Sequence, residues 1–165
     1  MSFPGAIGRA EFAALYDEHV GVVRSVLLRL CPGGRLDDLT QEVFLRAWRG
    51  QSSFRRQSSA KTWLCRIARN LAIDELRAVR PEPLPVDHDA AAPGIDPGER
   101  ALVLELLGRM EPDDRLLLVL LCVEQCSIAE IAEVLEVPAG TVKSRAFTLR
   151  QKLKQELTRK EAVHG

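Results

Sequence analysis

Residues 127–145, SIAEIAEVLEVPAGTVKSR, combine a capping signal, apolar residues at helical spacing and a cluster of cations and hydroxyls. Ser127 and Glu130, three residues apart, form the capping-box pattern that begins a helix and satisfies its first amides. Pro138 suits the first turn of a second helix, because its missing amide hydrogen costs nothing there. The pattern predicts a helix-turn-helix of the kind that enters the major groove of DNA.

The second helix of this motif carries the side chains that could contact DNA. Its periodicity predicts that Val142 and Phe147 turn inward, while Lys143, Ser144 and Arg145 turn outward. Hydroxyl and cationic side chains bond phosphates or base edges, and Lys or Arg with guanine is the commonest specific pair. The alternative interpretation is a helical hairpin of an unrelated bundle.

Charge is segregated along the chain although the 23 basic and 23 acidic residues cancel overall. Residues 55–80 carry a net charge of +5 and residues 139–160 a net charge of +6. Residues 81–98 hold four acids and no Lys or Arg. Two basic segments on an otherwise acidic chain indicate two separate contacts with a polyanion, and two solvated helix faces are the alternative.

Composition and length describe a folded, helix-rich chain. With 165 residues, 46% hydrophobic and 28% charged, the sequence can form one ordinary domain or two small ones. The longest apolar run, at 116–123, is too short to cross a bilayer, and the first residues lack the pattern of a secretory signal. We therefore expect a cytoplasmic protein without membrane insertion.

The four cysteines fit no zinc-ribbon spacing, and no His lies near enough to complete a compact ligand set. Core thiols are the default expectation, with a redox or metal pair of Cys122 and Cys126 as the alternative. No phosphate-binding glycine loop, nucleophile triad or pair of catalytic carboxylates is recognisable. We therefore expect no cofactor, no metal and no enzymatic activity.

The first half of the chain predicts three helices, at about 10–30, 37–49 and 60–79. The second of them has a buried side led by Val43 and Phe44. Its other side is polar with one exposed Leu, which fits a docking surface as well as a solvated face. This side consists of Asp38, Gln41, Glu42, Leu45 and Arg49.

The third helix and the loop before it form the first basic segment. Trp63 shares the apolar stripe of this helix, so we favour core packing over base stacking for its ring. The loop 50–59 holds Phe54, Arg55 and Arg56, and the side of the helix predicted to face outward holds Thr62, Arg66, Arg69, Asn70 and Arg77. Cations and an amide beside an aromatic loop could grip a single strand and capture unpaired bases.

Residues 81–98 contain five prolines and few large apolar residues, which is typical of a linker. Beyond it we expect a short helix from Glu99 to Met110, a turn holding Pro112 and Asp113, and a very apolar helix leading into the helix-turn-helix. The sequence therefore predicts an all-α fold of two small helical domains joined by a flexible, Pro-rich, acidic linker.

Three strings in this order resemble the extracytoplasmic-function type of bacterial sigma factor: DDLTQEVFLRAWR at 37–49, TWLCRIARNLAIDELR at 62–77 and IAEIAEVLEVPAGTVKSR at 128–145. The resemblance implies sigma domain two at 1–80, a linker at 81–98 and sigma domain four at 99–165. It also implies core RNA polymerase and promoter DNA as partners, with an anti-sigma factor holding the protein inactive.

The resemblance also gives the exposed residues roles. The polar face of helix 37–49 would bind the clamp coiled coil of the polymerase. The minus-10 element would be read and held open by Phe54, Arg55, Arg56, Lys61, Thr62, Arg66, Arg69, Asn70 and Arg77. The minus-35 duplex would be read by Thr141, Lys143, Ser144, Arg145, Thr148, Arg150 and Lys152.

Six positions depart from the pattern of these relatives. Thr148 stands where Arg is frequent and Cys65 where Tyr is frequent, which bears on base preference at minus-35 and on the melting face. Glu136 and Gln125 stand where Gly is frequent, so a left-handed backbone at Glu136 would cost about 1 kcal/mol. Leu116 and Leu121 stand where charge is frequent, which makes one helix apolar nearly all round. A partner surface and a deeper local core are both consistent with these two leucines, and the paired substitutions Leu116→Glu and Leu121→Glu would distinguish them.

Two other functions compete with a promoter-specificity subunit. One is a stand-alone regulator whose first lobe only dimerises, and the other is a sigma mimic that titrates an anti-sigma factor without touching DNA. Residues 37–77 argue against the first, because a dimerisation lobe needs neither a docking face nor a basic face. The two basic segments argue against the second, because a decoy could lose them.

Overall fold

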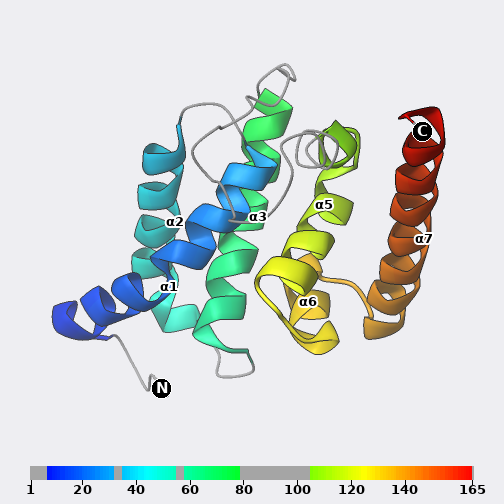
Figure 1. The fold of residues 1–165 in the computed structure, drawn as a ribbon. Helices are drawn as coiled ribbons and strands as arrows, with labels where there is room; N and C mark the ends of the chain where they lie inside the picture. The colour runs from blue at the N-terminus through cyan, green and yellow to red at the C-terminus, as the bar shows by residue number, and fades with distance from the viewer. Residues whose placement is uncertain (1–6, 32–34, 55–57, 79–104, 165) are drawn as a thin grey trace.

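The computed structural model describes residues 7–31, 35–54, 58–78 and 105–164, and within these ranges the chain forms helices and connecting turns with no strand. The first lobe contains α1 (Arg9–Leu30), α2 (Leu36–Gly50), the short 3₁₀ turn η1 (Gln51–Ser53) and α3 (Ala60–Ala78) (Figure 1). These bounds confirm the three helices predicted from hydrophobic periodicity. The all-α prediction is confirmed as well.

The core of the first lobe lies where α1, α2 and α3 meet. Val23, Val26 and Leu27 of α1 are fully buried. Phe12 adds an edge-to-face contact with Trp48, with ring centroids 4.9 Å apart, which fastens the start of α1 to the end of α2. Asp37 and Asp38 occupy the first turn of α2, where carboxylates favour the positive end of the helix. The lobe thus presents α2 and α3 as firmly positioned helices.

The second lobe begins with helical residues 105–108 and continues through α5 (Pro112–Leu118), the π-helical turn η2 (Val119–Val123), α6 (Ile128–Leu135) and α7 (Ala139–His164). The predicted turn at Pro112 and Asp113 is wrong. Both residues lie in the first turn of α5, because proline needs no amide partner there and an aspartate suits that end of a helix.

The first helix of the predicted helix-turn-helix, α6, begins with the predicted capping box. The Ser127 amide donates to Glu130 Oε2 at 2.7 Å, and the Glu130 amide donates to Ser127 Oγ at 3.2 Å, so the capping box is confirmed. Glu136 ends α6 with φ 56° and ψ 42°, and Gln125 has φ 51°. Both non-glycine residues therefore carry the left-handed backbone, and its strain, that the sequence suggested for Glu136.

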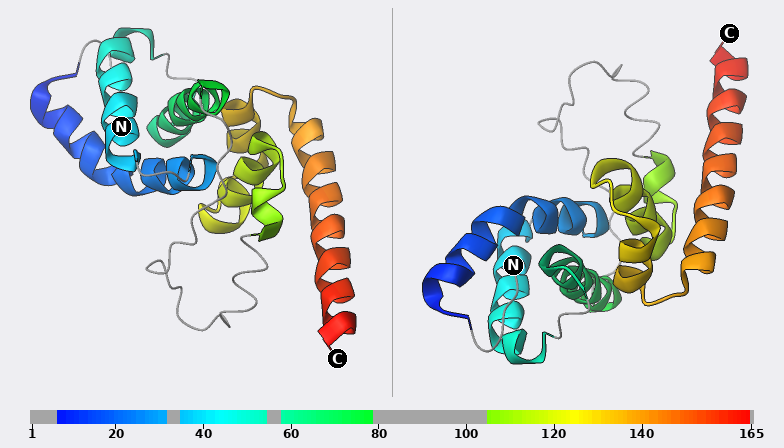
Figure 2. Two further views of the ribbon diagram at one scale, coloured as in Figure 1. Left: turned by 90° about the horizontal axis from the view of Figure 1, so that it is seen from above. Right: turned by 90° about the horizontal axis from the view of Figure 1, so that it is seen from below.

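The two lobes pack against each other. Figure 2 shows α3 between the first two helices and the second lobe, with α7 along the outer edge. Buried residues of both lobes form one continuous cluster, in which α3 packs on α6 and α1 packs on α5. Leu116 is 1% exposed, which favours the deeper core over a partner surface at this position, and Leu121 is partly buried. The linker predicted at 81–98 lies outside the described residues.

Candidate nucleic-acid interface

The helix α7, which holds the predicted recognition residues, turns these polar side chains away from the core. Val142, Ala146 and Leu149 are buried, whereas Lys143 and Ser144 are exposed, as is Arg145. The Ser144 hydroxyl donates to the carbonyl oxygen of Thr141 at 3.1 Å, which holds the side chain against the helix while its lone pairs remain outward. This helix therefore presents a cation-and-hydroxyl surface along its first turns.

The prediction that Phe147 turns inward is wrong, because its side chain is 66% exposed. Residues 142 and 147 are five apart and so point about 140° apart around a helix. The inner positions are filled by Val142, Ala146 and Leu149 at three- and four-residue spacing. Phe147 thus joins the outward surface of α7, next to Lys143 and Ser144 in the helical projection. The five-residue spacing from Val142 is the sequence feature that predicts the exposure of Phe147.

The other residues of α7 predicted to contact DNA lie on two sides of the helix. Arg150 and Lys152 are exposed, as is Thr148, whereas Thr141 is half-buried. A groove of about 550 Å³ runs between α3, the start of α5 and α7. Its walls include Arg145, Thr148 and Lys152 from α7 and the acidic residues Glu111, Asp113 and Asp114 from the start of α5. One side of the recognition helix therefore faces the acidic start of α5.

The polar face of α2 borders a second groove, of about 600 Å³, between α2 and α3. Leu45 is 41% exposed at this groove, as predicted from the sequence. Glu42 holds Arg46 through an i,i+4 hydrogen bond of 2.8 Å. Four of the five predicted docking residues line the groove: Asp38, Gln41, Glu42 and Leu45. The fifth, Arg49, is exposed one turn further along α2.

The candidates on α3 divide into a solvent-facing set and a set that faces the second lobe. Asn70 and Arg77 are exposed and Arg66 is half-buried. Thr62 is only 4% exposed, so its predicted outward orientation is wrong; its hydroxyl lies 2.9 Å from Ser59 Oγ at the start of the helix. The Nζ of Lys61 donates to the carbonyl oxygen of Glu124 at 2.9 Å.

Phe54 and Trp63 join the loop to the core of the first lobe. Their ring centroids lie 4.6 Å apart with the planes tilted by 39°. Trp63 is 8% exposed, which confirms core packing for this ring. Phe54 is half-buried beside it. Arg55 and Arg56 lie outside the described residues.

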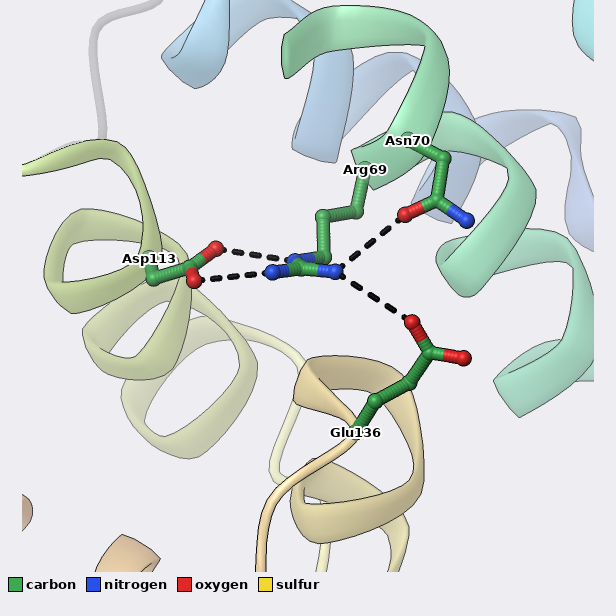
Figure 3. A network of polar contacts seen from close by, with 4 residues as sticks. All are labelled: Arg69, Asn70, Asp113 and Glu136. Carbon is green, nitrogen blue, oxygen red and sulfur yellow. Dashed lines mark hydrogen bonds and ion pairs between the residues drawn. The ribbon is translucent and has the colours of Figure 1, made fainter.

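Arg69 is the most highly engaged cation of the candidate surface (Figure 3). Its Nε and Nη2 each donate to one carboxylate oxygen of Asp113 at 2.8 Å, and Nη1 donates to Asn70 Oδ1 at 3.2 Å. Nη1 also lies 3.7 Å from the carboxylate of Glu136. The hydrogen bond with Asp113 is the main cause that raises the pKa of Arg69 above its ordinary value. The expected outward position is wrong, because the second lobe covers this face.

The thiols differ in their surroundings. Cys65 and Cys126 are buried, and burial raises the pKa of Cys65 to about 12 and also raises that of Cys126. Cys31 is half-buried, and burial raises its pKa to about 11. Cys122 is exposed, so the core position expected for it is wrong. In the part of the chain that the structure describes, no group of three His, Cys, Asp or Glu side chains is arranged to hold a metal.

None of the helices in the described ranges combines the length and the apolar run that a bilayer span requires. The exposed side chains of α2, α3 and α7 include acids and an amide beside Leu45 on α2, cations on α3, and cations and hydroxyls beside Phe147 on α7. Such groups suit contacts with a nucleic acid and with a protein partner.

Solved structures share this arrangement of helices. The sigma factor RpoE, in complex with the anti-sigma factor NepR from Bartonella quintana, superposes with a TM-score of 0.76 at 24% identity, covering 90% of this chain and 97% of that one. CnrH, in complex with the cytosolic domain of CnrY, superposes with a TM-score of 0.69 at 27% identity, covering 92% and 90% of the two chains.

Comparisons of the amino-acid sequence also find similarity to sigma factors. The model of Sigma-70 region 2 matches residues 15–81, and that of Sigma-70, region 4 matches residues 100–153. The ECF RNA polymerase sigma factor SigW of Bacillus subtilis is 34% identical over 73% of this chain and 74% of its own length. The ECF RNA polymerase sigma-E factor of Escherichia coli is 33% identical over 78% and 77%. The chain belongs to the extracytoplasmic-function family of RNA polymerase sigma factors.

Proposed function

We propose that this protein binds core RNA polymerase, directs it to promoters by reading their minus-10 and minus-35 elements, and helps to open the DNA. The observation that carries the proposal is the combination, in one chain, of an exposed Leu45 groove on α2 and an outward cation-and-hydroxyl surface on α7. A stand-alone regulator needs only the second of these surfaces. The protein acts by binding, without enzymatic chemistry of its own, and it works in the cytoplasm.

The polymerase docks on the polar face of α2. Leu45 supplies the apolar centre of this face, and the side chains of Asp38, Gln41 and Glu42 form its rim. An apolar anchor within a polar rim is the usual anatomy of a protein interface. Arg49 extends the rim along the helix.

The minus-10 strand is held by α3 and the loop before it. Arg66, Asn70 and Arg77 supply donors for phosphates and bases, and Phe54 offers an aromatic ring near the start of the helix. Lys61, Thr62 and Arg69 belong to the same proposed surface, and Arg55 and Arg56 complete the basic segment. A site that binds unstacked bases offsets the few kcal/mol that each opened base step costs.

The minus-35 duplex is read by the start of α7 in the major groove. Lys143, Ser144 and Arg145 contact base edges, together with Thr141 and Thr148. Arg150 and Lys152 lie further along the helix and contact phosphates, which fixes the position of the helix without reading sequence. Phe147 adds an apolar contact of the kind that a thymine methyl group accepts.

An anti-sigma factor is the proposed regulator. Of the solved structures described above, RpoE is in complex with the anti-sigma factor NepR and CnrH is in complex with the cytosolic domain of CnrY, and this chain shares their arrangement of helices. The division of labour follows the chain: residues 1–80 as sigma domain two, 81–98 as the linker and 99–165 as sigma domain four. The anti-sigma factor would exclude polymerase by covering the face around Leu45.

Run-off transcription with purified core polymerase over a genomic promoter library tests the proposal. We expect transcripts from a small set of promoters that share one minus-10 and one minus-35 sequence. A protein that binds duplex DNA but never programs the polymerase would instead be a stand-alone regulator. A protein that binds neither polymerase nor DNA, yet captures an anti-sigma factor, would be a decoy.

A further inference from the structure

Two triplets of polar residues on α7 repeat the same arrangement two helical turns apart. The first is Lys-Ser-Arg at 143–145 and the second is Arg-Gln-Lys at 150–152, so each has a cation on either side of an uncharged polar residue. All six side chains are exposed. Seven residues turn an α-helix by about 700°, so the second triplet points to within about 20° of the first.

Gln151, the central residue of the second triplet, points away from the core. The buried side of α7 is formed by Val142, Ala146 and Leu149, and Gln151 lies about 170° around the helix from the centre of that side. Figure 2 shows α7 at the outer edge of the molecule, with the other helices on one side of it. The amide of Gln151 forms no hydrogen bond with a residue of the described ranges, so its donor and acceptor are available to a ligand.

The cations beside Gln151 point to the two flanks of α7. Arg150 and Lys152 each lie about 100° around the helix from Gln151. Lys152 lines the groove toward the start of α5, which places Arg150 on the opposite flank. A helix in the major groove has a phosphate backbone along each flank and base edges between them. The residue between two phosphate-binding cations therefore faces the base edges.

We propose that Gln151 reads an adenine of the minus-35 duplex, about three base pairs from the base that Ser144 contacts. The inference rests on the proposed placement of α7 in the major groove. At about 1.5 Å per residue, Gln151 lies about 10 Å along the axis from Ser144, and stacked base pairs are about 3.4 Å apart. The amide of glutamine donates to N7 of adenine and accepts from its N6 amino group, a pair of groups that only adenine presents in the major groove.

Gln155 offers a matched control on the same helix. It is exposed one turn beyond Gln151 and has the same side-chain chemistry. Its neighbours differ, because Lys154 stands on one side and Glu156 on the other. A carboxylate on one flank repels the phosphates that would have to pass there. We therefore expect Gln155 to read no base.

Selection from a promoter library tests this assignment in the full-length protein bound to core polymerase. The minus-10 element is fixed, the minus-35 element is randomised, and the bound DNA is sequenced. Gln151→Ala should lower the preference for adenine about tenfold at one position and leave the other positions unchanged. Gln151→Glu keeps the acceptor and loses the donor, so the preference there should move to cytosine, whose N4 amino group donates. Gln155→Ala should give the parent's profile.

Each other outcome is decisive. If both Gln151 variants select the parent's sequence, or weaken binding to all sequences alike, the reading of a base by Gln151 is wrong, while a parent that selects one minus-35 sequence keeps the proposed function. If the parent selects no sequence in this element, the proposed function of α7 is wrong and base reading by Gln151 falls with it. Arg150→Ala should weaken all sequences alike. A changed base preference in Arg150→Ala would place Arg150 over the bases and overturn the assignment of Gln151.

Discussion

The guanidinium of Arg115, on α5, donates to the carbonyl oxygen of Arg29 at the end of α1, with Nη1 and the oxygen 2.9 Å apart. Its Nε donates to the carbonyl of Leu107 at 2.8 Å and its Nη2 to that of Met110 at 3.2 Å. Arg115 is 8% exposed, and this burial lowers its pKa from the ordinary value. Backbone carbonyl oxygens at helix ends thus offset the cost of burying this cation, and its hydrogen bonds join the two lobes.

Arg115→Met should lower the free energy of unfolding by about 3 kcal/mol, because it leaves several buried carbonyls without a donor. Urea unfolding at neutral pH measures the change. Arg109→Met is the control: Arg109 is 71% exposed and pairs with Glu105 one helical turn earlier, so its loss should change stability by less than about 0.5 kcal/mol. Equal losses in the two variants would contradict this role of Arg115.

Leu45→Glu should weaken binding to core polymerase about tenfold, equivalent to about 1.4 kcal/mol, because it places a charge at the apolar centre of the α2 face. Titration of labelled core polymerase measures the affinity. Leu157→Glu makes the same change at a leucine that is 38% exposed near the far end of α7, and it should leave the affinity unchanged. Unchanged affinity in Leu45→Glu would remove α2 from the docking surface.

Lys143→Ala should cost about 1 to 3 kcal/mol on the cognate minus-35 duplex and relax its selectivity, since a base contact is lost. Lys152→Ala should weaken cognate and scrambled duplexes alike and lower the salt dependence, as expected for a phosphate contact. Binding isotherms on both duplexes at two salt concentrations distinguish these effects. If Lys143→Ala affected both duplexes equally, Lys143 would belong with the phosphate contacts.

The buried thiols predict sensitivity to alkaline pH. The folded-state pKa of Cys65 is about 12, above the ordinary value of 9.0, so the folded protein keeps a proton that the unfolded chain releases. The resulting contribution to stability is complete below pH 9 and is lost as the pH rises from 9 toward 12. Cys65→Ala should make the fall in unfolding free energy shallower by about 1 kcal/mol per pH unit over this window. Cys122→Ala, at an exposed thiol, should retain the parent's slope.

The sequence predicted those features that depend only on residues close together in the chain. Helix bounds, the capping box of Ser127 and the exposure of Leu45 follow from spacing along one helix. Phe147 is 66% exposed because it lies five residues from Val142, about 140° away around the helix. Its exposure is consistent with a role outside the core.

The environment of Arg69 could not be predicted in the same way. Periodicity assigns a helix one buried side, but α3 is covered by its own lobe on one side and by α6 on the other. The partners of Arg69 lie 44 and 67 positions away in the chain, and no local pattern connects them. Tertiary packing of the two lobes decides these contacts.

Permanganate reactivity of thymines in the minus-10 element tests the central claim most directly. Promoter DNA is treated in the presence of core polymerase alone, this protein alone, or both together. The account predicts reactive, unpaired thymines only when both are present, with a weaker signal for Leu45→Glu. Thymines that stay protected with both present, or that open without polymerase, would contradict the assignment of this chain as a promoter-opening subunit.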